Sequence, residues 1–177
     1  MVEAVDIPGK ATVGELAFLR ACASIAPRDG AYIELGCYQG RSTAAILDGS
    51  VCDLISIDDF SYAPPDLGPS SASVVAAHLG IRCDRWRCVF GDSASIPPKV
   101  EQVAFIFVDT EHTASRLTVE FDAWLPLTVP GAVIVLHDYS PRFAGIVAVV
   151  DRRLGHSDEW QMIGREGAMI AFRKAGE

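Results

Sequence analysis

The sequence lacks long apolar runs, and no stretch reaches the ~18 residues that a membrane-crossing helix needs, so we predict no membrane span. It also lacks a basic segment followed by an apolar one near its start, so we expect no secretory signal and a cytoplasmic protein. Basic residues are few: 15 Lys and Arg stand against 23 Asp and Glu, and the net charge of −8 without a basic stripe disfavours a nucleic-acid partner. The five cysteines show no C-x-x-C spacing, which indicates reduced thiols and no zinc site.

The apolar content is typical of a globular chain and not of a disordered one. Half of the 177 residues are apolar and the mean hydropathy is +0.25. A chain of this size can bury a full core in one domain. We therefore predict a single domain over residues 1–177, in which residues 1–11 form a loose lead-in.

Strand and helix signals alternate along most of the chain. Short apolar runs indicate the strands, and the segments between them carry apolar residues at helical spacing, with a capping box at Thr12 and Glu15 before the first helix. Strands are predicted at 31–35, 54–57, 86–90, 103–108 and 132–136, and helices after Thr12 and Gly40 and at 72–79, 114–125 and 143–154. The alternation predicts an α/β fold with a doubly wound, mostly parallel sheet.

The tail departs from this alternation. Two further strand signals, at 160–163 and 168–172, are separated only by Gly164–Gly167. So short a connection joins antiparallel strands, because a parallel pair needs a crossover of about a dozen residues or more. The prediction is therefore a seven-stranded, Rossmann-like sheet that finishes with a C-terminal antiparallel hairpin strand.

The most informative segment is Tyr32–Thr43, which has the pattern of a buried strand, a glycine turn and a helix start. Such a junction presents backbone N–H groups to a ligand. A dinucleotide fingerprint needs G-x-G-x-x-G, but here the glycines are Gly36 and Gly40, and Tyr38 stands where the second glycine is expected. This argues against NAD, and the P-loop pattern is missing as well. The segment favours a nucleoside cofactor.

Acidic residues follow the second and third predicted strands. Asp58 lies 22 positions after Gly36, and Asp59 follows it directly. A carboxylate at this spacing can accept hydrogen bonds from the two ribose hydroxyls of a nucleoside. Asp92 and Ser93 follow the third strand, where an acidic group can accept a hydrogen bond from an adenine amine. The alternatives are a solvated acid at the second strand and a capping turn at the third.

Two central strand ends carry carboxylates and imidazoles together. Asp109, Glu111 and His112 follow one strand, and His137 and Asp138 follow the next. Because neighbouring strands of a doubly wound sheet deliver their carboxyl ends to one crevice, these groups should meet near the glycine loop. They would suit a divalent cation such as Mg²⁺ or acid–base chemistry. The alternative is that His137 and Asp138 cap the following segment.

The motifs taken together resemble a known enzyme family. The form E-x-G-x-x-x-G and the strand ends are similar to those of class I S-adenosylmethionine-dependent methyltransferases, in particular small bacterial sugar and macrolide O-methyltransferases and cephalosporin-hydroxylase-like proteins. The resemblance covers most of residues 12–173. Its segments are Tyr32–Thr43, Ile57-Asp58, Val108–His112, Trp124–Leu127, Pro130-Gly131 and His137–Tyr139.

The resemblance implies transfer of a methyl group from S-adenosylmethionine to a hydroxyl of a small molecule or sugar, with Mg²⁺ as a candidate cofactor. It assigns cofactor contacts to the glycine loop and to the acidic strand ends. These residues are Glu34, Gly36, Cys37, Tyr38, Gly40, Ser42, Asp58, Asp59, Asp92, Ser93 and Asp109.

The resemblance also assigns the chemistry. Asp109 and Asp138 match the metal-binding acids, and His112, three residues after Asp109, matches the general base. His137 stands where some members have a third carboxylate, and imidazole is a poorer ligand for Mg²⁺, so metal dependence stays open. A homo-oligomer is compatible with the resemblance. The alternatives are a cofactor-binding module without catalysis and an NAD-dependent oxidoreductase.

Overall fold

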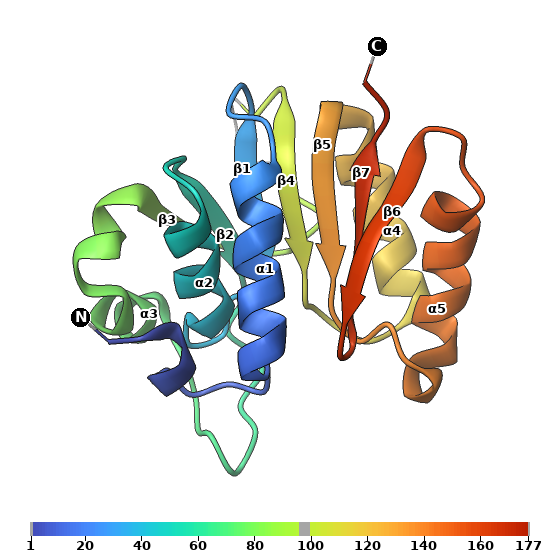
Figure 1. Ribbon diagram of the computed structural model, residues 1–177. Helices are drawn as coiled ribbons and strands as arrows, with labels where there is room; N and C mark the ends of the chain where they lie inside the picture. Colours follow the sequence, from blue (N-terminus) through green and yellow to red (C-terminus); the bar gives the residue numbers. More distant parts are fainter. Residues whose placement is uncertain (1, 96–99, 177) are drawn as a thin grey trace.

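The computed structural model of the chain describes residues 2–95 and 100–176 (Figure 1). Its centre is a seven-stranded sheet in the order β3-β2-β1-β4-β5-β7-β6. Strands β1 to β5 pair in parallel, whereas β7 runs antiparallel to both β5 and β6. The strands are β1 (Ala31–Leu35), β2 (Leu54–Asp58), β3 (Trp86–Phe90), β4 (Val103–Val108), β5 (Thr128–Leu136), β6 (Trp160–Glu166) and β7 (Met169–Lys174). The predicted fold class is confirmed.

Helices cover both faces of the sheet. The α-helices are α1 (Val13–Ile25), α2 (Arg41–Gly49), α3 (Ala72–Leu79), α4 (Ala114–Trp124) and α5 (Ala144–Val150). Helices α1 and α2 lie on one face, and α4 and α5 lie on the other (Figure 1). Shorter 3-10 turns span Ala4–Asp6, Gly80–Arg85, Leu125–Leu127 and Pro141–Phe143, and a π-helical turn spans Asp151–Gly155. None of the helices within the described ranges is long and apolar enough to cross a membrane.

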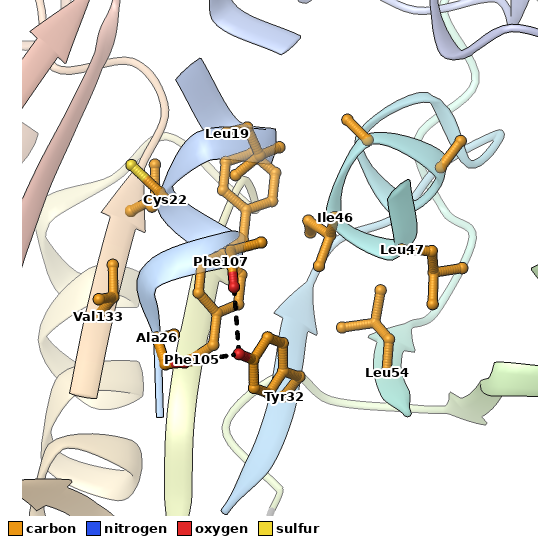
Figure 2. Packing of buried hydrophobic residues seen from close by; sticks show 14 of the residues in the cluster. Leu19, Cys22, Ala26, Tyr32, Ile46, Leu47, Leu54, Phe105, Phe107 and Val133 are labelled. Atoms are coloured by element: carbon orange, nitrogen blue, oxygen red, sulfur yellow. Dashed lines mark hydrogen bonds between the residues drawn. The ribbon is translucent and has the colours of Figure 1, made fainter. Parts of the chain in front are cut away.

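Each face of the sheet carries its own hydrophobic core, because successive side chains of a strand point to opposite faces. Tyr32 and Phe105 point toward α1 and α2, and their rings stack at 5.2 Å (Figure 2). The Tyr32 hydroxyl lies 3.1 Å from the Ala23 carbonyl and 3.2 Å from the Ala26 carbonyl, at the end of α1. These contacts occupy carbonyl groups that a helix end leaves without partners, so the tyrosine fixes α1 on the sheet.

The largest differences from the sequence-based expectation are at β5, at the hairpin turn and at the last helix, and other elements differ by one or two residues. Strand β5 begins at Thr128, so the expected turn at Pro130-Gly131 lies inside it, at an irregular register beside β4 where Gly131 takes φ +78°. Strand β6 continues to Glu166, which shortens the hairpin turn to residues 167–168. The expected helix at 143–154 divides into α5 and the π-helical turn. At β5 and β6, pairing with a neighbouring strand overrides a local glycine or proline signal.

The segment at residues 2–11, expected as a loose lead-in, is held against the domain. Ile7 is fully buried. The Arg41 guanidinium donates hydrogen bonds to the carbonyls of Val5, Ile7 and Ala11. Arg82 donates to the Val2 carbonyl at 2.9 Å. The expectation of a loose segment was wrong because the residues that hold it lie at least 30 positions away in the sequence. Such contacts produce no local sequence pattern. We call residues 2–11 the N-terminal strap.

Candidate active site

The carboxyl ends of five strands form one continuous row. Backbone hydrogen bonds continue the sheet one residue past each strand and so place the residues that follow the strands side by side. These bonds run from Gly91 to Asp58, from Gly36 to Ile57, from Asp109 to Leu35 and from His137 to Val108, at 2.9–3.1 Å. The row carries the acidic and imidazole groups predicted from the sequence to one edge of the sheet.

An open cleft follows this row. Most of the predicted site residues line it. The lining includes Gly36, Cys37, Tyr38, Asp58, Asp59, Asp92, Ser93, Asp109, His112, His137 and Asp138. Arg116, Arg142 and residues 8–11 of the N-terminal strap complete its walls. The sequence patterns did not identify these last residues, because nothing local distinguishes them from ordinary surface positions.

The glycine loop, residues 36–40, owes its glycines to two close contacts. Gly36 has φ +83°, and a Cβ atom there would lie 2.1 Å from the Asp109 carbonyl oxygen. Gly40 has φ +92° and precedes α2, and a Cβ atom there would lie 2.9 Å from a methyl group of Val75. Gly36 therefore lets the loop cross the end of β4, whereas Gly40 lets α2 pack on α3 and lies outside the cleft lining.

Glu34 and Ser42 lie beneath the loop and not in the cleft. The Glu34 carboxylate is fully buried and accepts hydrogen bonds from the hydroxyls of Ser42, Thr43 and Ser56 at 2.5–2.8 Å. Burial raises the pKa of Glu34 to about 7, although the three hydroxyls favour its ionised form. Glu34 faces inward because alternate residues of β1 point to the α1–α2 face, so its visible role is to join β1, β2 and α2.

Asp58 shapes the glycine loop. One carboxylate oxygen accepts the N–H groups of Cys37 at 2.7 Å and Tyr38 at 2.8 Å, and the other accepts the N–H of Phe60 at 2.6 Å. Asp59 is exposed, and its pKa is lowered by hydrogen bonds from Ser61. Both acids border the cleft, so their ribose role stays a prediction.

Asp92 and Ser93 are held by α4. Asp92 accepts the N–H of Ala94 at 2.8 Å, which is the turn given above as the alternative interpretation. The Arg116 guanidinium pairs with Asp92 and contacts the Ser93 hydroxyl, and the hydrogen bond from Arg116 lowers the pKa of Asp92. Trp124 donates its indole N–H to the Ser93 carbonyl at 2.7 Å. Side chains of α4 thus hold the segment that follows β3 in place.

Four titratable groups meet at the ends of β4 and β5. His112 Nε2 lies 2.9 Å from Asp138 Oδ2. His137 Nδ1 lies 3.2 Å from the same oxygen and 3.6 Å from Asp109 Oδ1. Asp138 has φ +59°. This conformation is uncommon for residues other than glycine, and where it occurs it is often at a functional site. One ligand atom from each of Asp109, His137 and Asp138 lies within 4.8 Å of the others.

The pKa values of the groups in this cluster depend on one another. Burial raises the pKa of Asp109 to about 6 against the attraction of the imidazoles. Burial opposes the charged form of His137, but the nearby Asp138, Asp109 and Glu15 raise its pKa to about 9. Burial also opposes ionisation of Asp138, but the two imidazoles and Arg142 lower its pKa. The interpretation of His137 and Asp138 as caps finds no support, because neither following helical turn receives a side-chain cap in the described chain.

The opposite end of the cleft is closed by the N-terminal strap and the loop at residues 61–70. The Tyr38 hydroxyl donates to the Gly68 carbonyl at 2.6 Å, and the Gln39 amide donates to the Leu67 carbonyl at 2.9 Å. Lys10 of the strap pairs with Asp66 of the loop. The loop at residues 61–70 is therefore fastened to the glycine loop and to the strap.

Replacing Arg41 by Met should release the N-terminal strap. Hydrogen bonds from a charged donor contribute roughly 1.5–3 kcal/mol each, and freeing the chain regains entropy, so we expect a loss of about 2–4 kcal/mol in the free energy of unfolding. Cofactor affinity should fall as well, because residues 8–11 border the cleft. Urea unfolding would measure the stability, limited proteolysis with mass spectrometry the release of the strap, and binding calorimetry the cofactor affinity. Arg28→Met, at an exposed position, is the control, and equal cleavage of the two variants near residue 10 would contradict the role of Arg41.

The strand order, the single antiparallel strand β7 and the glycine loop at the end of β1 together define the class I methyltransferase fold. In such open sheets the ligand binds beyond the carboxyl ends of the strands, where the cleft lies here.

Comparison with known proteins identifies the family. The pattern of a family described as a methyltransferase domain matches residues 33–139, and the chain belongs to this family. The prediction of a class I S-adenosylmethionine-dependent methyltransferase is thereby confirmed. No protein with curated function has a significantly matching sequence.

Solved structures share the fold. The O-methyltransferase NovP has 15% identity and a TM-score of 0.74, over 98% of this chain and 86% of that one. A protein from Corynebacterium glutamicum has 16% identity and a TM-score of 0.74, over 97% and 84% of the two chains. The O-methyltransferase TomG from Streptomyces achromogenes, solved with S-adenosylmethionine, has 19% identity and a TM-score of 0.64, over 99% and 87%.

Proposed function

We propose that the protein transfers a methyl group from S-adenosylmethionine to a hydroxyl of a small molecule or sugar. The observation that carries the proposal is the meeting of His112, Asp138 and Asp109 at the end of the cleft that begins at the glycine loop. Two fold relatives support the cofactor, since TomG was solved with S-adenosylmethionine and a Bacillus cereus O-methyltransferase with its product SAH. CalS11 supports a sugar acceptor, since it is a TDP-rhamnose 3'-O-methyltransferase.

The cofactor would lie along the row of strand ends. The glycine loop lines the cleft, Asp58 or Asp59 would accept the ribose hydroxyls, and Asp92 would accept the adenine amine. This order would place the sulfonium methyl toward Asp109 and His112. The acceptor would then enter from the side of Arg142 and Phe143, which border the same end of the cleft.

His112 is the proton acceptor in this scheme. Asp138 Oδ2 lies 2.9 Å from its Nε2, so a hydrogen on Nε2 would donate to this carboxylate and leave the Nδ1 lone pair free. The acceptor oxygen forms a bond to the methyl carbon as the carbon–sulfur bond breaks, the sulfur keeps that electron pair, and His112 takes the hydroxyl proton. The protein contributes mainly alignment and removal of this proton.

The residues at the ends of β4 and β5 fit a divalent cation. Both ring nitrogens of His137 are buried and have no hydrogen-bond partner of acceptable geometry within the described residues. A buried polar group without a partner costs about 1–3 kcal/mol, and a cation beside the ring would supply such a partner. Asp109, His137 and Asp138 would hold the ion. A bound cation lowers the pKa of a coordinated hydroxyl and fixes its direction.

Binding calorimetry with S-adenosylmethionine and with NAD tests the cofactor. We expect binding of the first compound only, and Asp58→Asn should weaken it roughly 10–100-fold, because hydrogen bonds to a charged acceptor contribute about 1.5–3 kcal/mol. Asp53→Asn is the matched control, since Asp53 is exposed at the opposite end of β2. Binding of NAD, or equal effects of the two substitutions, would overturn the assignment.

A further inference from the structure

A buried carboxylate from α1 reaches the histidine of the site. Glu15 is only 4% exposed. Its Oε2 accepts hydrogen bonds from the Thr12 N–H at 2.8 Å and the Thr12 hydroxyl at 3.0 Å. Its Oε1 accepts the Ala168 N–H at 2.8 Å and lies 3.6 Å from His137 Nε2. One side chain thus connects the start of α1, the β6–β7 turn and the strand-end cluster.

The molecule makes room for this carboxylate. A Cβ atom at Gly167 would lie 2.6 Å from Glu15 Oε1, so a side chain at this turn position would displace the carboxylate from its place beside His137. Backbone donors on both sides hold the two oxygens in place. The capping box explains the contacts with Thr12, but it does not require Oε1 to point at the imidazole.

The two sides of the His137 ring face different partners. Nε2 faces Glu15, whereas Nδ1 faces Asp109 and Asp138. Neither nitrogen makes a well-formed hydrogen bond with any described group. Metal-binding histidines commonly direct one nitrogen at the ion and donate the other N–H to a carboxylate, which fixes the ring and its tautomer. The His137 ring is oriented in the same way, with Nδ1 on the side of the two aspartates and Nε2 facing Glu15 Oε1 at 3.6 Å, just beyond hydrogen-bond distance.

We propose that Glu15 is a positioning residue that presents His137 Nδ1 to a cation held by Asp109 and Asp138, and that the resulting site prefers a first-row divalent transition-metal ion to Mg²⁺. The inference rests on the proposed function, since it concerns the same strand ends. Imidazole is a ligand for transition metals, whereas Mg²⁺ requires oxygen ligands in near-ideal octahedral geometry. Two carboxylates with one oriented imidazole therefore suit Mn²⁺ or Co²⁺ better.

The test is calorimetric titration of the metal-stripped full chain with Mn²⁺, Co²⁺ and Mg²⁺ in turn. The wild-type protein should bind Mn²⁺ and Co²⁺ at least about 10-fold more tightly than Mg²⁺. Glu15→Gln should weaken Mn²⁺ and Co²⁺ binding about 10–100-fold, the usual effect of losing a carboxylate behind a ligating histidine. The visible absorption of bound Co²⁺ should change in the same variant, which reports ligand geometry without turnover.

Thr12→Ala is the matched control for Glu15→Gln. It removes the hydroxyl that donates to Oε2 and accepts the Glu15 N–H, and so lowers the melting temperature. The backbone N–H of residue 12 still donates to Oε2, and Oε1 stays beside His137, so cation affinity should be unchanged. Equal loss of affinity in the two variants would show that Glu15 acts only through the helix cap. Unchanged affinity in a folded Glu15→Gln protein would overturn its positioning role.

His137→Asp tests the choice of ion without altering Glu15. An all-carboxylate site should lose the preference for Mn²⁺ and Co²⁺ over Mg²⁺, and an unchanged ratio would overturn the inference. Wild-type protein that binds no cation, or binds Mg²⁺ as tightly as Mn²⁺, would do the same. If S-adenosylmethionine still binds and methyl transfer proceeds without metal, the proposed function stands and only this inference fails.

Discussion

Replacing His112 by Ala should leave S-adenosylmethionine binding intact and lower the rate of methyl transfer roughly 10²–10⁴-fold, the contribution expected from a positioned proton acceptor. The reason is that His112 stands at the proposed acceptor end of the cleft, against Asp138 and the ring of Phe143, whereas the glycine loop and Asp58 lie nearer β1 and β2. The rate would be followed as formation of S-adenosylhomocysteine with a panel of sugar and small-molecule hydroxyl acceptors.

His156→Ala is the matched control, because His156 is exposed after the π-helical turn and lies outside the cleft lining. It should change neither binding nor rate. A His112→Ala protein that binds the cofactor and transfers methyl groups at the wild-type rate would remove His112 from the mechanism. Turnover by neither variant nor the wild type, with binding preserved, would favour a cofactor-binding module without catalysis.

Replacing Gly36 by Ala should abolish cofactor binding and destabilise the fold by more than about 3 kcal/mol. The added Cβ would lie 2.1 Å from the Asp109 carbonyl oxygen, a backbone atom held by the pairing of β1 with β4. Relief requires the loop to move away from the end of β4, and a left-handed conformation adds roughly 1–2 kcal/mol for a residue with a side chain. Denaturant unfolding and binding calorimetry would measure the two effects.

Gly68→Ala separates the two contributions at Gly36. Gly68 has φ +75°, close to that of Gly36, but a Cβ atom there would meet nothing within 4 Å. Gly68→Ala should therefore lower the free energy of unfolding only by the cost of the left-handed conformation, about 1–2 kcal/mol. If Gly36→Ala cost no more than Gly68→Ala and still bound the cofactor, the close approach of the loop to β4 would have no functional importance.

The sequence predicted the sheet and the row of strand ends because both depend on local periodicity. The continuous apolar run at β4 and the short runs at β1 and β3 match their observed bounds, and parallel pairing then brings Asp109 and His137 together without further information. The direction of a side chain on its strand was harder to anticipate. Glu34 belongs to the motif but points to the α1–α2 face, so its pattern alone suggested a cofactor contact that the structure places under the loop.

The contacts made across long sequence distances were invisible to any local pattern. Arg41 binds the N-terminal strap more than 29 residues upstream, and Glu15 meets Ala168 across 153 positions. Glu15 was assigned from the sequence only to a capping box, which the structure confirms. The capping box alone does not show that Glu15 also faces His137, because that contact depends on how α1 packs against the β6–β7 hairpin.

The β6–β7 turn shows how an apparently peripheral element can restrict protein engineering. The Tyr139 N–H donates to the Ala168 carbonyl, and the Arg165 guanidinium donates to the Tyr139 carbonyl, directly after Asp138. Hairpin tips are ordinarily permissive places for grafting a peptide or splitting a chain. Here the tip supports the segment that follows Asp138, so an affinity tag or a circular permutation junction would be better placed near the exposed residue Val51.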